Sequence, residues 1–272
     1  MLGCALAAGL VYFWRSSFQL GAVPQLPFTL GVAGLFTVLY IAAFCIWRFA
    51  KGKLALQAAL CVLGLGLVFV FATPPLQVPD EALHYQRAYT ISTGRLNYDG
   101  ARTYPDDVAN LLQSFPAGMQ HKVSYAGGEL ALKHFEEYNR LLEEKPTVEE
   151  APSESGVLTF MSLPYLPQAL AMAVARLFGF SALGILYAGR IGNLLLYALI
   201  CFFAFRNCDK YRGIFLALGL LPLSLFLAAS CSYDGLMLAL CYLAVSYFCK
   251  AGIHTKDVWG VGIAVALATY IK

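Results

Sequence analysis

The sequence predicts an all-α polytopic membrane protein with one large, partly helical loop on the outer side of the membrane. Of its 272 residues, 59% are hydrophobic and only 13% are charged, whereas a soluble domain averages about 25% charged residues. Residues 80–154 hold thirteen acidic and seven basic side chains, a net charge of −6, and the rest of the chain carries +9. Such an asymmetry is typical of membrane topology and does not indicate nucleic-acid binding.

A membrane-spanning helix needs roughly 20 apolar residues, and several runs approach or reach that length. They lie at 1–14, 28–47, 54–73, 158–178, 182–205, 213–230, 236–249 and 257–271. The first run has no basic stretch ahead of it, so a short membrane segment is expected there and not a cleaved signal peptide.

Short basic loops set the expected orientation. Lysines and arginines occur in "RFAKGK" (48–53), "RNCDKYR" (206–212) and "KAGIHTK" (250–256), and such loops stay in the cytoplasm. We therefore expect a multi-pass protein of the plasma (inner) membrane. It is expected to have four parts. They are N-terminal membrane segments with a cytoplasmic loop (1–53), a transmembrane helix (54–73), an extracytoplasmic loop (74–156) and a C-terminal transmembrane bundle (157–272).

One apolar segment between the outer loop and Asp234 must fail to cross the membrane if both are to lie outside. Three such segments separate them. Segment 158–178 is the first choice, because its Pro164 and Pro167 interrupt a helix. A pair of short arms around "FGFSALG" (178–184) is the alternative.

The outer loop is too long to be a structureless connection. Pro79 suits a first helical turn, and this helix is expected to reach about Ser92 and to end at Gly94. Apolar residues at helical spacing predict a second helix in 128–145. A short helical piece and turns are expected between the two helices, and 145–155 is interpreted as a polar linker.

The first loop helix carries groups that are able to do chemistry. Asp80, His84 and Arg87 are spaced i, i+4 and i+7 and so share one face, whereas Glu81 points about 100° away. A carboxylate can take a proton from a hydroxyl, and a guanidinium can hold a phosphate. The alternative is that both acids only cap the helix and that His84 and Arg87 face lipid headgroups.

Two further charges lie in apolar surroundings. Asp234, in "AASCSYDGLML", is expected to have a function at the interface or in a cavity, or else to cap a helix that begins at Gly235. Arg190 lies close to Asn193 within "LYAGRIGNLLLYALI" and needs an acid or a lipid phosphate as partner, unless it snorkels to the interface.

Other polar residues give weaker signals. Tyr165, with Ser162 and Gln168, is a candidate for lining a polar groove. The eight cysteines have no zinc spacing and are expected to be small buried apolar residues, and His121, His134 and His254 have no ligand-like spacing. No metal site or cofactor is predicted, although a role for a divalent metal stays open.

Three stretches together resemble the bacterial domain-of-unknown-function family 2142, which is grouped with the C-type (GT-C) glycosyltransferases. They are "PPLQVPDEALHYQRAY", "YLPQALAMAVARLFGFSALGILYAGRIGNLLLY" and "LLPLSLFLAASCSYDG". The resemblance covers roughly residues 54 to 250 and implies a GT-C-like transmembrane bundle. Family members are usually longer, so the chain is expected to be a fragment or a shortened paralogue.

The resemblance also implies roles for individual residues. GT-C enzymes use polyprenyl-phosphate sugars as donors and keep an acid just after a membrane helix, a place held here by Asp80 or Glu81. A second acid in a later outer loop corresponds to Asp234, and Arg87 and Arg190 would hold the lipid phosphate. His84, Tyr165 and Asn193 complete the expected substrate-binding set.

The expected function is therefore inverting transfer of a sugar to a hydroxyl of an envelope glycan or protein at the outer face. Two other functions remain open. A transporter or flippase of a lipid-linked or polar solute would place the charges in a midplane cavity. A non-catalytic membrane scaffold would use the acidic 129–154 stretch to bind a partner.

Overall fold

The computed structural model of the chain describes residues 48–96, 103–115, 128–147, 150–152, 162–208 and 210–271, with positions 34, 41 and 45. Its described part is helical apart from two short strands, which confirms the predicted helical class. The expected N-terminal segment 1–14 lies outside the described residues, as does all but three positions of segment 28–47.

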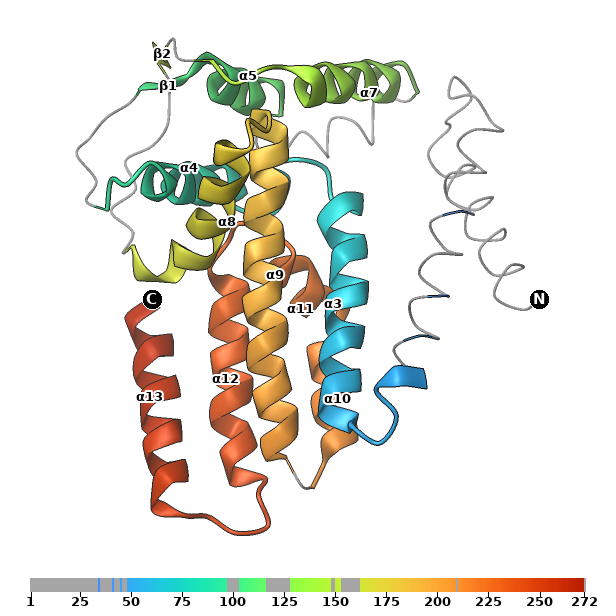
Figure 1. Cartoon of the computed structure of the whole chain (residues 1–272), viewed down its shortest axis with the longest axis vertical. Helices are drawn as coiled ribbons and strands as arrows, with labels where there is room; N and C mark the ends of the chain where they lie inside the picture. Colours follow the sequence, from blue (N-terminus) through green and yellow to red (C-terminus); the bar gives the residue numbers. More distant parts are fainter. Residues whose placement is uncertain are drawn as a thin grey trace.

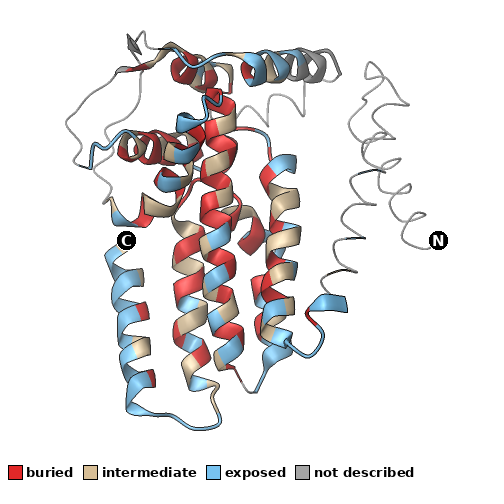
Figure 2. Cartoon of the chain, in the orientation of Figure 1, coloured by how far each residue is buried: buried red, intermediate tan, exposed pale blue. Residues whose placement is uncertain are grey.

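A bundle of helices forms around α9 (Ala182–Asn207). The helices α3 (Leu54–Ala72), α8 (Leu166–Leu177) and α12 (Asp234–Phe248) pack against it, and α13 (Thr255–Ile271) packs on α12 (Figure 1). A burial map shows most of α9 buried and most of α13 exposed (Figure 2). The first half of α9 is its most deeply buried part and lies in the core of the described bundle.

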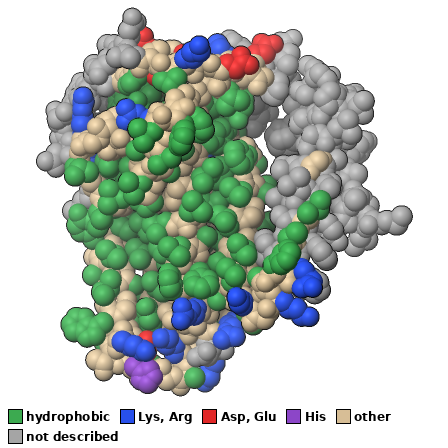
Figure 3. All heavy atoms as spheres, viewed as in Figure 1, with side chains coloured by type: hydrophobic (Ala, Val, Ile, Leu, Met, Phe, Trp, Pro, Cys, Tyr) green, Lys and Arg blue, Asp and Glu red, His purple; other side chains and the backbone are tan. Residues whose placement is uncertain are grey.

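Two of the described helices are long and apolar enough to cross a membrane, namely α3 with 19 residues and α9 with 26. Hydrophobic side chains cover the waist of the bundle in the face shown, and Lys and Arg gather at one end (Figure 3). That end holds the loops 48–53, 206–212 and 250–256, so the basic loops that predict orientation lie together.

Between the outer loop and Asp234, segment 158–178, described here from residue 162, does not run the length of the bundle. Its α8 has 12 residues, about 18 Å of helix, and it lies beside α4 (Glu81–Ser92) at the end opposite the basic loops. The alternative of two short arms is wrong, because α9 is continuous and begins with Ser181 accepting from the Gly184 amide at 3.2 Å, an ordinary N-cap.

After α9 the chain crosses back along the bundle as a broken helix. It consists of α10 (Arg212–Gly219) and α11 (Pro222–Ala228), with Pro222 at the first turn of the second piece. Tyr197 of α9 donates to the Gly219 carbonyl and Tyr242 of α12 to the Leu218 carbonyl, both at 3.2 Å. These bonds satisfy backbone groups that the break frees. Asp234 consequently starts α12 at the same end as the 74–80 segment.

The described parts of the outer loop form a layer over this end of the bundle. Helix α7 (Gly128–Glu143) follows its prediction closely, and α5 (Asp106–Ser114) is the expected short piece. Both contact the start of α9 (Figure 1).

Two expectations for the loop were wrong. Pro79 precedes the N-cap residue of α4 and is not in its first turn. The supposed linker contains β2 (Glu150–Pro152), which pairs antiparallel with β1 (Thr103–Pro105). Strands of three residues are too short to show an alternating pattern.

Candidate functional site

A buried ion pair joins the loop helix to the bundle. Arg190 Nε donates to Glu81 Oε1 at 2.8 Å, and Arg190 Nη2 donates to Glu81 Oε2 at 2.7 Å. Both side chains are 0% exposed. This two-pronged geometry is the strong form of a carboxylate–guanidinium pair. An acid or a lipid phosphate was expected as the partner of Arg190, and in the structure its partner is an acid, Glu81.

The remaining donors of Arg190 hold the chain between α3 and α4. Nη1 donates to the carbonyls of Val70 and Thr73 at 2.9 and 2.8 Å, and Nη2 to that of Pro74 at 2.9 Å. A guanidinium has five N–H groups, and these bonds with the Glu81 pair use all of them. In this arrangement Arg190 has no donor left for a lipid phosphate.

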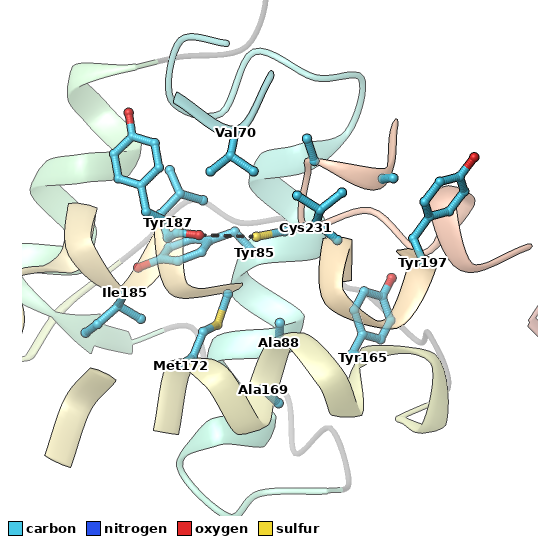
Figure 4. Close-up of a cluster of buried hydrophobic side chains, with 14 of the residues drawn as sticks. Val70, Tyr85, Ala88, Tyr165, Ala169, Met172, Ile185, Tyr187, Tyr197 and Cys231 are labelled. Carbon is cyan, nitrogen blue, oxygen red and sulfur yellow. Dashed lines mark hydrogen bonds between the residues drawn. The ribbon is translucent and has the colours of Figure 1, made fainter. Parts of the chain in front are cut away.

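The same pair reaches the segment before α12. The Cys231 amide donates to Glu81 Oε1 at 3.1 Å, so Glu81 links α4, α9 and residues 229–233. Figure 4 shows Cys231 close to Tyr85 of α4 and Val70 of α3 at this junction. The Glu81 carboxylate is thus occupied on both oxygens.

Asn193, one turn further along α9, binds the same segment, residues 229–233. Its Nδ2 donates to the carbonyls of Ser230 and Ser232 at 2.9 and 2.8 Å, and its amide lies 3.1 Å from that of Gln168. Asn193 is 1% exposed. Its contacts are those of a residue that positions the 229–233 segment.

A second cluster lies one turn further along α4, around His84. His84 Nδ1 lies 2.7 Å from the Tyr165 hydroxyl, and its ring meets that of Tyr233 edge-on at 5.0 Å between centroids. The Tyr165 and Tyr233 rings are 5.9 Å apart. Three elements therefore meet at this imidazole: α4, η1 (Leu163–Tyr165) and the turn before α12.

Asp80 and Asp234 both act on this imidazole. Burial lowers the pKa of His84 below its ordinary value, while the negative charges of Asp234, Asp80 and Glu81 each oppose that fall. The same two aspartates raise the pKa of the Tyr233 hydroxyl, after the larger effect of burial. Two acids far apart in the sequence thus lie close enough to one histidine to affect its charge.

The two acids differ in surroundings. Asp80 is exposed and takes a left-handed backbone conformation with φ of 56°, and among the described residues its carboxylate makes no cap bond to α4. Asp234 is half-buried, and its Oδ2 accepts from the Ser232 hydroxyl at 3.0 Å. A non-glycine residue with positive φ is uncommon, and strain of this kind gathers at functional sites.

Arg87 lies next to the His84 cluster. Its Nη2 donates to the Ser162 hydroxyl at 2.8 Å and to the Leu96 carbonyl at 2.9 Å, and its positive charge acts on the Tyr165 hydroxyl. Both His84 and Arg87 are 4% exposed. The alternative that they face lipid headgroups is therefore wrong.

The structure divides the predicted residues into two groups. Asp80, His84, Tyr165 and Asp234 meet in one cluster with Arg87 beside it, whereas Glu81, Arg190 and Asn193 form the internal connections that hold this end together. The alternative in which both acids of the Pro-Asp-Glu stretch only cap a helix is wrong for Glu81, which is paired with Arg190.

Tyr233 and Ser232 were not predicted from the sequence, where the only signal for them is their position beside Asp234. The prediction that the cysteines are buried was wrong for Cys61 and Cys241, which are exposed. Within the described ranges, no group of three or more His, Cys, Asp or Glu side chains lies together as metal ligands would.

Comparison with known proteins places this chain in a family. The model of the family described as "Predicted membrane protein (DUF2142)" matches residues 61–272. No curated protein matches the chain, and no solved structure matches it either.

Proposed function

Because the chain belongs to the DUF2142 family of predicted membrane proteins, we propose that it is a glycosyltransferase that moves a sugar from a lipid-linked donor to an acceptor at the membrane surface. The donor is a polyprenyl-phosphate sugar, and the acceptor is a hydroxyl of an envelope glycan or protein. The reaction takes place at the outer face of the plasma membrane, with loop 74–156 outside.

One observation carries this proposal. Two acids from separate parts of the chain, Asp80 and Asp234, approach the same histidine at the end of the bundle away from the basic loops. A lipid-linked donor presents its sugar at the membrane surface, and a base is required there for the acceptor hydroxyl. The exposed carboxylate of Asp80 suits the base, because Glu81 is committed to Arg190.

In the proposed step, the acceptor hydroxyl gives its proton to the Asp80 carboxylate. The acceptor oxygen forms a bond to the anomeric carbon from the face opposite the phosphate, and the bond between that carbon and the phosphate oxygen breaks. Polyprenyl phosphate leaves with the electron pair, and the configuration inverts. One base is enough for such a single displacement.

Other residues have supporting roles in this proposal. Asp234 orients the acceptor, and neutral His84 with Tyr165 shapes the site between the two acids. Arg87, whose positive charge acts on the Tyr165 hydroxyl of this cluster, meets the charge of the leaving phosphate. Glu81, Arg190 and Asn193 are positioning residues, because they act through the two segments that they hold.

The test is the glycan output of cells whose own copy of the gene has been removed. We expect Asp80→Asn to lower the transfer rate by roughly 10²–10⁴-fold with the protein folded at its usual level in membranes. Glu143→Gln is the matched control, since Glu143 is an exposed acid on the same loop layer. If the surface glycans of the Asp80→Asn, Asp234→Asn and Glu143→Gln strains are identical to those of the unmodified strain, the proposal is wrong.

A transporter or flippase is the second candidate, and the break between α10 and α11 favours it. Discontinuous membrane helices often mark a substrate site in transporters. A transporter would move an intact lipid-linked sugar across the vesicle membrane without releasing free polyprenyl phosphate. The transferase would release one polyprenyl phosphate for each sugar transferred.

A further inference from the structure

A groove opens at the basic end of the bundle, on the side away from Asp80. It has a volume of about 650 Å³ and lies between the start of α3, the end of α9 and α10. Pockets for organic ligands commonly have 300–1,000 Å³. The groove is therefore large enough to hold part of a lipid molecule.

Most of the groove is lined by apolar side chains. Side chains of α3, α9 and α10 form it, among them Leu54, Ala58, Cys61, Phe202, Phe205 and Leu216. Cys61 is exposed and Phe205 is buried, so the groove extends from the outer surface of the bundle to its core. An acyl chain is the ligand portion that such a lining accommodates.

Three cations stand at one end of this apolar lining. They are Lys53, Arg206 and Arg212, and all of them are exposed. None of the described lining residues is acidic. Arg212 is held in place by a bond from its Nε to the Cys208 carbonyl at 2.7 Å. The groove thus combines an apolar channel with an anion-attracting end.

We propose that this groove binds an anionic membrane phospholipid, with one acyl chain along the apolar lining and the headgroup phosphate at Lys53, Arg206 and Arg212. Basic pockets between transmembrane helices on the cytoplasmic side bind anionic headgroups, and the basic loops predict that side here. The site is separate from the proposed sugar-transfer site and does not depend on it.

The test measures lipid binding by the purified full-length chain in a zwitterionic detergent. Phosphatidylglycerol is titrated while the thermal unfolding midpoint is followed, and native mass spectrometry counts the bound lipid. We expect a saturable rise in the midpoint with one lipid bound. The triple variant Lys53→Gln, Arg206→Gln, Arg212→Gln is expected to bind about a hundredfold more weakly.

Two further variants make the result specific. Cys61→Phe keeps all three cations and fills the groove from an exposed position, and we expect it to abolish binding without lowering the midpoint of the lipid-free protein. Lys256→Gln removes a cation from the same end of the bundle but on α13, and it should bind as the unmodified protein does.

Several results would overturn the proposal. One is an equal midpoint rise in the triple variant and in Lys256→Gln. Another is an equal midpoint rise with phosphatidylcholine, which would show that the protein does not recognise the headgroup charge. A third is an equal effect of inorganic phosphate at the same concentration, which would show that the acyl chain contributes nothing.

Discussion

Arg190 of α9 and Glu81 of α4 form a fully buried pair with two hydrogen bonds, and the other three N–H groups of Arg190 bind carbonyls of residues 70–74. Glu81 also accepts from the Cys231 amide. One pair of side chains thus connects the end of α3, the start of α4 and the segment that leads to Asp234. This connection helps to place Asp234 near His84, whereas Asp80 and His84 are held together within α4, where the His84 amide donates to the Asp80 carbonyl at 3.1 Å.

Breaking this pair is expected to destabilise the protein strongly. Removing one partner of a buried ion pair leaves an uncompensated charge and costs about 3–5 kcal/mol. We expect losses of this size for Glu81→Gln and for Arg190→Gln, measured as the free energy of unfolding in detergent. The pair of Arg140 and Glu137, in which Arg140 is exposed and Glu137 half-buried, is the control. Arg140→Gln should cost less than about 1 kcal/mol.

The double variant separates the pair from its surroundings. If the two groups act on each other, the loss in the double variant is smaller than the sum of the two single losses by at least about 2 kcal/mol. Additive losses would mean that Arg190 stabilises the fold through the backbone carbonyls alone.

A close approach of α8 to α9 predicts an intolerant glycine. A Cβ at Gly192 would lie 2.5 Å from the Pro167 carbonyl oxygen and 2.8 Å from Ala171 Cβ. Small residues permit such contacts between membrane helices. We expect Gly192→Ala to lower the free energy of unfolding by about 1–3 kcal/mol.

Gly262 on α13 is the matched control for Gly192. An added Cβ there meets no atom of the described residues within 4 Å. Because alanine favours a helix over glycine, Gly262→Ala should raise stability by up to about 1 kcal/mol. Equal effects at the two positions would contradict the observed packing of α8 on α9.

The pH dependence of stability should depend on His84. Its pKa in the folded protein lies below its ordinary value, chiefly through burial, so the unfolded chain binds the proton more readily. Between these two pKa values stability falls as the pH falls, starting near the unfolded value of about 6.5, and the full contribution of neutral His84 is present above it.

The variant His84→Gln should therefore lose less stability than the unmodified protein when the pH falls from about 7.5 to 5.5. His254→Gln is the control, because His254 is exposed, and it should follow the unmodified curve. The explanation fails if His84→Gln and the unmodified protein have parallel curves over this range.

The sequence predicted the features that depend on local physics. Helix α7 and the end of α4 at Gly94 follow from apolar spacing and glycine punctuation, and Gly94 has a positive φ of 88°. The basic loops predicted that Asp80 and Asp234 lie on the same side of the membrane. Both acids act on His84 in the folded chain.

Sequence alone did not assign roles to the paired residues. Glu81 and Arg190 are 109 positions apart, and no local pattern shows that they meet. Helix geometry showed only that Asp80 and Glu81 diverge, whereas the fold determines which acid turns inward. Likewise, only tertiary packing brings the hydroxyls of Tyr197 and Tyr242 to the carbonyls at the break between α10 and α11.

These hydroxyls give a further prediction. Tyr197→Phe and Tyr242→Phe each remove a donor to a carbonyl at the break, and each should cost about 0.5–1.5 kcal/mol in unfolding free energy. Tyr211→Phe is the control, because Tyr211 is exposed at the basic end. A cost for Tyr211→Phe as large as that of the other two would argue against this role.

The central claim is that Asp80 and Asp234 serve one sugar-transfer site, and the most direct measurement is the rate of polyprenyl-phosphate release by single and double variants in vesicles. Groups that act in the same step have strongly non-additive effects. We predict that the double variant Asp80→Asn, Asp234→Asn is no slower than the slower single variant, with unfolding midpoints unchanged. Independent, multiplying losses, or undiminished release in every variant, would contradict the claim.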